Sequence, residues 1–133
     1  MNLEKGSGIV SDVFYYLGLD WINKNYKYEQ DHLHPESRFN ESKPFNITND
    51  DWKKWRSIRN RLPNLHLLEG RTNGSKNDMR LIDYCNDMNS EQKELFYKQA
   101  LIPRDVSLEF DDFEEFYEKR KQLLKEKIIE LLK

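Results

Sequence analysis

The chain has few of the residues that form cross-links and cofactor sites. Its 133 residues include one cysteine, Cys85, which excludes an internal disulfide and a four-cysteine zinc site. Cys85 stands in a helical pattern and is expected to be a small core residue rather than a nucleophile. No apolar run approaches the roughly 18 residues needed to span a bilayer, and the first residues lack the apolar core of a signal peptide. A glycine-rich phosphate loop is also absent. These absences favour a cytoplasmic protein.

What is present suits one folded domain over residues 1–133. The length lies within the range of about 100–150 residues that is typical of single domains. Such a chain can bury a core without disulfides. Charged residues make up 35% of the sequence, as expected for long charged helices. An aromatic content of 13% argues against disorder, because disordered chains are poor in aromatic residues.

Charge is distributed unevenly along the chain. The net charge is −2, but residues 53–80 carry eight basic and two acidic side chains, while the segments on either side are each acidic. A polyanion would therefore be attracted to the central segment alone. A solvated helix face explains the same charges equally well. The basic side chains of this segment are Lys53, Lys54, Arg56, Arg59, Arg61, Arg71, Lys76 and Arg80.

Hydrophobic periodicity predicts an α+β fold. Tyr26–Gln30 alternates aromatic with polar residues, as a half-buried strand does, and Asn64–Leu68 is predicted to be a second short strand. The polar stretch between Pro35 and Thr48 is predicted to be a loop. Helices are predicted before Gly18, from Thr48 or Asn49 through Ile58, from residues 73–77 through Cys85, from a cap at Ser90 through Leu101, and after Pro103.

Two apolar stripes predict where helices pack. Trp52, Trp55 and Ile58 recur at three-residue steps and are expected in the core. Asp50 and Asp51 precede them and are expected to be charges at a helix start rather than a catalytic pair. The last helix carries a stripe that is expected to pack on its own domain rather than on a partner: Phe113, Phe116, Tyr117, Leu124, Ile128 and Leu131.

Two of the three histidines stand close together where the first predicted strand ends, in the order Gln-Asp-His-Leu-His-Pro-Glu. Asp31 and His32 close that strand, and Asn64 opens the next. Asn73 follows nine positions later, where a helix is expected to begin. Two strands followed by a helix can bring these four residues into one cleft. A surface turn without chemistry is the alternative.

The residue types in such a cleft suit hydrolysis of a phosphodiester. That reaction needs a base to deprotonate water and a cation to take up charge on the leaving oxygen. Histidine is the side chain whose pKa best suits a base near neutral pH. One aspartate and one asparagine, with phosphate oxygens and waters, would suffice to bind Mg²⁺.

These motifs resemble those of the HNH, or ββα-metal (His-Me finger), nucleases, whose pattern is roughly D-H-I-x-P, N-L-x-x-L and N-x-x-K. The chain has DHLHP from Asp31, NLHLL from Asn64 and NGSK from Asn73. Residues 61–78 and the last helix are similar to the C-terminal domain of GmrSD-type modification-dependent restriction enzymes. The resemblance extends from about Phe14 onward. It implies an α+β fold in which a ββα-metal HNH core, a short β-hairpin plus helix, is embedded in several α-helices.

Position by position, the resemblance implies a metal-dependent DNA endonuclease. His32 would be the general base, and Asn64 the residue that ties the loop together and orients that base. Asp31 and Asn73 would bind one Mg²⁺ or Mn²⁺ ion. His34 falls on a variable position, so it is either a contact behind the site or a tolerated polar residue. The side chains expected to bind DNA are Lys53, Arg59, Arg61, Arg71 and Lys76.

Other expectations concern bracing and partners. His66 lies within NLHLL and is expected to be a strand residue that faces solvent or a neighbour. No structural zinc is expected, so the bracing that zinc gives some HNH proteins, which stabilises the fold, must come from the C-terminal helices. GmrSD-type proteins carry a sensing and nucleotide-hydrolysing half before this domain. The resemblance therefore implies that the chain is the C-terminal domain of a larger restriction or phage-defence protein, a truncated relative, or a subunit that acts with a separate chain. No membrane partner is expected. The alternative is a non-catalytic nucleic-acid-binding or scaffolding module that retains the HNH fold.

Overall fold

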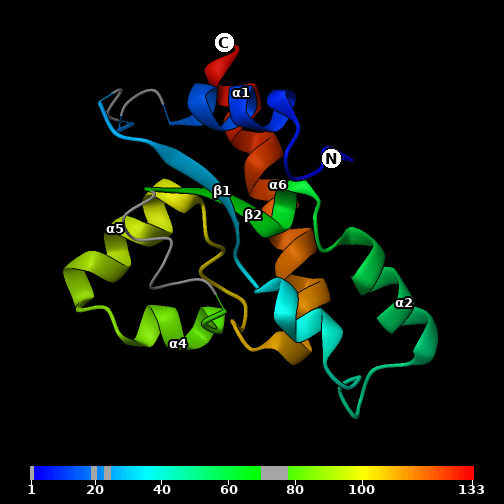
Figure 1. The fold of residues 1–133 in the computed structure, drawn as a ribbon. Helices are drawn as coiled ribbons and strands as arrows, with labels where there is room; N and C mark the ends of the chain where they lie inside the picture. The colour runs from blue at the N-terminus through cyan, green and yellow to red at the C-terminus, as the bar shows by residue number, and fades with distance from the viewer. Residues whose placement is uncertain (1, 19–20, 23–24, 70–77) are drawn as a thin grey trace.

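The computed structural model of the chain describes residues 2–18, 21–22, 25–69 and 78–133 (Figure 1). In these residues it has an α+β fold with five α-helices and one two-stranded antiparallel sheet, as the periodicity predicts. None of the described helices is long and apolar enough to cross a membrane. The elements are α1 (Gly8–Leu17), β1 (Tyr28–His32), α2 (Asn49–Ile58), β2 (Leu65–Glu69), α4 (Leu81–Asn86), α5 (Ser90–Ala100) and α6 (Phe113–Leu131), with 3-10 helices η1 (Glu36–Asn40), η2 (Leu62–Asn64) and η3 (Phe110–Asp112).

Helix α6 runs through the middle of the molecule, with α2 on one side and α4 and α5 on the other (Figure 1). It contributes to each of the three groups of buried apolar residues. Leu124 packs with residues of α1 and β2, Phe116 with residues of α4, and Phe113 with residues of α2. The predicted stripe therefore packs on its own chain: Phe113, Phe116, Tyr117 and Leu124 are buried, and Ile128 and Leu131 are partly buried.

A buried arginine connects α6 to the start of the second strand. The Arg120 side chain donates through Nη1 to the carbonyl oxygens of Leu62 (3.1 Å) and Pro63 (2.9 Å). Its Nε and Nη2 donate to the carbonyl oxygen of Ala100, at 3.2 and 3.0 Å. Burial lowers the pKa of Arg120 to about 9, so the guanidinium stays protonated at neutral pH. These charge-assisted bonds hold η2 and the end of α5 against α6, which is the bracing expected of the C-terminal helices.

The two strands pair antiparallel, with Asp31 opposite His66 and His32 opposite Leu65. Since successive side chains of a strand point to opposite faces, Asp31 and His66 share one face, and His32 lies on the other. Residues 33–64 connect the strands and include α2.

The strand boundaries are shifted relative to the prediction. The first strand was expected at Tyr26–Gln30 but spans Tyr28–His32, so Asp31 and His32 belong to its paired residues. The second begins at Leu65, because Asn64 ends the 3-10 turn η2. The segment predicted to be loop contains the short helix η1, which buries Phe39. Pairing between strands, rather than alternation within one, sets these limits.

Helix α2 follows the prediction closely. The side chain of Thr48 accepts a hydrogen bond from the backbone N–H of Asp51, as expected of a helix cap. Trp55 and Ile58 are buried, and Trp52 packs against them at the edge of the same group. The expectation that this stripe is core is confirmed.

Helices α4 and α5 begin at residues other than those predicted. The helix was expected from residues 73–77 through Cys85, and that start lies outside the described residues. Among the described residues, α4 begins at Leu81, because the backbone of Arg80 is extended. Cys85 within α4 is buried, as expected of a core residue. Asn89 rather than Ser90 caps α5. Its side chain and that of Gln92 each accept from the other's backbone N–H, a reciprocal arrangement that satisfies two helix-start donors.

Candidate functional site

His32 is the last residue of β1, and an amide fixes its imidazole. Nε2 lies 2.6 Å from Oδ1 of Asn60, which comes from the turn after α2. Because an amide oxygen only accepts, Nε2 carries the hydrogen and the lone pair is on Nδ1 in the neutral ring. That tautomer is competent to take a proton from water. Sequence reasoning missed Asn60, and no local pattern marks it, because it stands 28 residues away from His32.

Asn64 is fully buried and joins the segments on either side of the connection between the strands. Its Oδ1 accepts from the backbone N–H of His34 at 2.9 Å. Its Nδ2 donates to the carbonyl oxygens of His34 (3.0 Å) and Arg59 (2.9 Å). The backbone carbonyl of Asn64 also accepts from the N–H of Leu33 at 2.8 Å. Asn64 thereby holds the chain that follows His32 and the residue that precedes Asn60.

His34, whose role was left open, lies in the core. It is 1% exposed. Its ring packs edge-on against Phe110, Phe113 and Phe116, with centroid distances of 5.9, 5.5 and 4.8 Å. Together with the two bonds from Asn64 to its backbone, this packing makes His34 part of the support behind β1 rather than a surface group.

Asp31 leaves the strand on the side opposite His32 and meets His66 of β2. Oδ2 of Asp31 lies 3.3 Å from Nε2 of His66, and both side chains are nearly buried. The ring of His66 also packs edge-on against Phe96 of α5, at a centroid distance of 5.8 Å. Of the two surroundings expected for His66, solvent is wrong and a neighbour is correct. Its contact with Asp31 was not predicted, because it depends on the pairing register of the two strands.

Three of the basic residues expected to bind DNA lie in the described part of the chain. Lys53 is exposed on α2. The Nε of Arg59 lies 3.6 Å from a carboxylate oxygen of Glu36. Arg61 lies next to Tyr117; burial raises the pKa of that phenol to about 12, and the charge of Arg61 acts in the opposite direction. Arg59 and Arg61 flank Asn60, so the basic segment reaches the residue that holds His32.

The remaining predicted residues, Asn73, Arg71 and Lys76, lie outside the described residues. Within the described part of the chain, no three His, Cys, Asp or Glu side chains form a group that could hold a metal ion. The carboxylate of Asp31 is a hard oxygen donor and fits the preference of Mg²⁺ and Mn²⁺ for oxygen. A cation bound mainly through water and substrate phosphate needs only one or two such donors from the protein.

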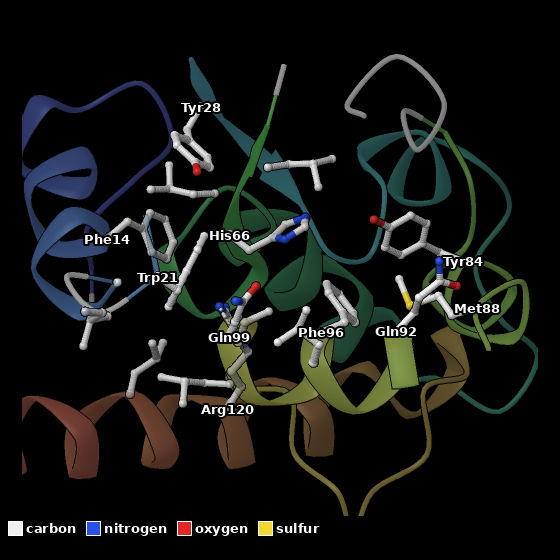
Figure 2. A pocket seen from close by; sticks show the side chains of 18 of the residues that line it. Phe14, Trp21, Tyr28, His66, Tyr84, Met88, Gln92, Phe96, Gln99 and Arg120 are labelled. Atoms are coloured by element: carbon white, nitrogen blue, oxygen red, sulfur yellow. Dashed lines mark hydrogen bonds between the residues drawn. The ribbon is translucent and has the colours of Figure 1, made fainter. Parts of the chain in front are cut away.

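A cavity of about 520 Å³ lies beneath β2 and is bordered by α1, α5 and α6 (Figure 2). His66 is at its centre in this view, with the hydroxyl of Tyr84 directed toward it, while Gln99 and Arg120 are at its floor. Burial first, and then the neighbouring Cys85 and Asp31, raise the pKa of Tyr84. His66 therefore contacts Asp31 with one nitrogen while its ring forms part of the cavity wall.

Comparison of the chain with models of known protein families finds no match, and a search of curated proteins finds no significant relative. The resemblance to HNH nucleases therefore depends on the motif residues and their positions.

Proposed function

We propose that the chain is a metal-dependent endonuclease domain of the HNH type, which hydrolyses DNA phosphodiester bonds with His32 as the general base. The observation that supports this most is the 2.6 Å hydrogen bond from Nε2 of His32 to Oδ1 of Asn60. Asp31, the preceding residue, leaves β1 on the opposite face. A base needs a fixed tautomer, and a phosphodiester needs a nearby cation site. We assign both requirements to the end of β1, where Asp31 and His32 are consecutive residues.

The proposed reaction begins with a water molecule near Nδ1 of His32. The imidazole takes one proton from the water, and the oxygen attacks the phosphorus as the bond to the leaving oxygen breaks. The contact with Asn60 keeps the ring from rotating and stabilises the imidazolium that forms, because the amide oxygen continues to accept from Nε2. Asn64 acts on the same ring through the backbone of Arg59 and His34.

Asp31 would hold the cation, together with Asn73 as the resemblance implies. The chemistry that Mg²⁺ or Mn²⁺ supplies when bound is stabilisation of the charge on the phosphate and leaving oxygens. The side chains of Asp31 and His32 leave β1 on opposite sides. However, their Cα atoms are only about 3.8 Å apart, and the strand ends here, so a phosphate group could lie across the strand end and meet both. Two paired antiparallel strands are in keeping with the hairpin of an HNH core.

The resemblance also suggests the biological setting. Restriction or phage defence, with a sensing and nucleotide-hydrolysing domain or subunit as partner, would fit a nuclease domain of this size. A role in defence can be tested by the plating efficiency of phage on cells that express either the parent chain or the His32→Ala variant. The biochemical proposal itself is tested by cleavage of plasmid DNA, which must require a divalent cation.

Binding of DNA should be weak and strongly dependent on salt. The proposed DNA contacts come from the basic segment 53–80, of which Lys53, Arg59 and Arg61 are described residues. Even three phosphate contacts would lower affinity about 20-fold between 50 and 150 mM salt. The measurement is fluorescence anisotropy of a labelled duplex over a salt series. Charge reversal at exposed Lys53 should weaken binding and reduce the salt slope by about 1. The same change at Lys125, exposed on α6, is the matched control. An affinity that does not change with salt would remove the electrostatic basis of the proposed DNA contacts.

A further inference from the structure

The carboxylate proposed to hold the cation is itself held by a side chain from the other strand. Asp31 and His66 are directly opposite each other in the pairing register. Nε2 of His66 lies 3.3 Å from Oδ2 of Asp31. Such a cross-strand contact restricts rotation of the carboxylate about χ2, a torsion angle that otherwise has only a broad preference.

The position of His66 is in turn determined by packing. Its side chain is 3% exposed. Phe96 of α5 contacts the ring edge-on, and Figure 2 shows the imidazole enclosed between the strands and α5. Phe96 also packs on Tyr84 at 5.4 Å, so the wall around His66 is a continuous set of rings. Packing against Phe96 restricts the imidazole on the side of α5, so its nitrogen gives Asp31 a partner in a defined position.

We propose that His66 is a positioning residue that holds the Asp31 carboxylate in the orientation in which it binds a divalent cation. The inference rests on the proposed function, because it assigns a purpose to a contact with a proposed metal ligand. Hydrogen-bonded partners of metal ligands typically contribute 10–100-fold to metal affinity. Removing the N–H of His66 should therefore weaken metal binding while the base, His32, on the other face of the sheet, is unaffected.

Two variants of similar size separate the hydrogen bond from the packing. His66→Leu fills the space without a donor, and His66→Gln keeps an N–H donor. Binding of Mn²⁺ to the full chain is measured by electron paramagnetic resonance of the free ion, with no DNA present, and folding by circular dichroism. We expect the Kd for Mn²⁺ to rise 10–100-fold in His66→Leu and to stay within about threefold of the parent in His66→Gln. Phe96→Leu, which loosens the packing around His66 but keeps the N–H, should raise the Kd less than His66→Leu does.

An unchanged Mn²⁺ Kd in a folded His66→Leu would overturn the proposal, as would equal weakening in the Leu and Gln variants. If His66→Leu does not fold, His66→Gln is the deciding variant. A Kd of His66→Gln for Mn²⁺ more than tenfold above that of the parent would contradict the positioning role of His66. A parent that binds Mn²⁺, with the expected dependence on His66, but does not cut DNA leaves the positioning role standing and refutes the nuclease function. A parent that binds no Mn²⁺ refutes both.

Discussion

Replacing His32 with alanine should lower the rate of DNA cleavage by more than 100-fold while leaving the fold and DNA binding nearly intact. A positioned general base contributes about 10²–10⁴-fold to a rate, and the contact with Asn60 positions the imidazole of His32. Because the missing group is the base, additional metal should not restore activity. The measurement is the initial rate of nicking of supercoiled plasmid, beside circular dichroism and anisotropy with labelled DNA.

The choice of control follows from the structure. His34→Ala is a poor control, since His34 is buried among three phenylalanine rings and its truncation would leave a cavity. Asn60→Ala is more informative. It removes the acceptor that orients His32 but keeps the base, so it should reduce the rate by less than His32→Ala does. A purified His32→Ala variant that cuts as fast as the parent would mean that His32 is not the base.

Asn64→Ala should destabilise the protein by about 3–5 kcal/mol, because each buried polar group left without a partner costs about 1–3 kcal/mol. The change removes the bonds to the N–H and C=O of His34 and to the C=O of Arg59, all at a fully buried position. Against the 5–15 kcal/mol that is typical of a folded domain, such a loss is severe. It should appear as a much lower midpoint in urea unfolding.

Asn40→Ala is the matched control for Asn64→Ala. Asn40 is an exposed asparagine at the end of η1, and its truncation should change stability by no more than about 0.5 kcal/mol. If the Asn64 variant unfolded at the same urea concentration as the parent, the three hydrogen bonds would not be what holds the connection between the strands.

Periodicity and cap chemistry were sufficient to predict the elements with strong local signals. The stripe of Trp52, Trp55 and Ile58 and the cap at Thr48 define α2 without any knowledge of the rest of the chain. Helix α4 was predicted less well, since Met79 and Arg80 are not helical, and the helix begins where Leu81 becomes buried. Packing against distant residues sets that boundary, and no local pattern encodes it.

The candidate site also combines residues that the local sequence predicts with contacts that depend on distant parts of the chain. The motif spacing identified Asp31, His32 and Asn64, and the structure brings each of them to the ends of the two strands. Their partners were not predictable. His66 reaches Asp31 only through the pairing register, and Asn60 reaches His32 only because a whole helix intervenes and returns the chain. His34 could be assigned to the core only when the position of α6 was known.

The most direct test of the central claim is the cleavage of supercoiled plasmid by the purified chain with Mg²⁺, with Mn²⁺ and with EDTA. We expect nicked and linear products with either ion and none in EDTA, with activity restored when the chelator is removed and the ion is added back. Cleavage that persists undiminished in EDTA would contradict the proposed dependence on a cation at Asp31. Absence of cleavage by the folded chain under every condition, also with the proposed partner domain or subunit added, would favour a binding or scaffolding module instead.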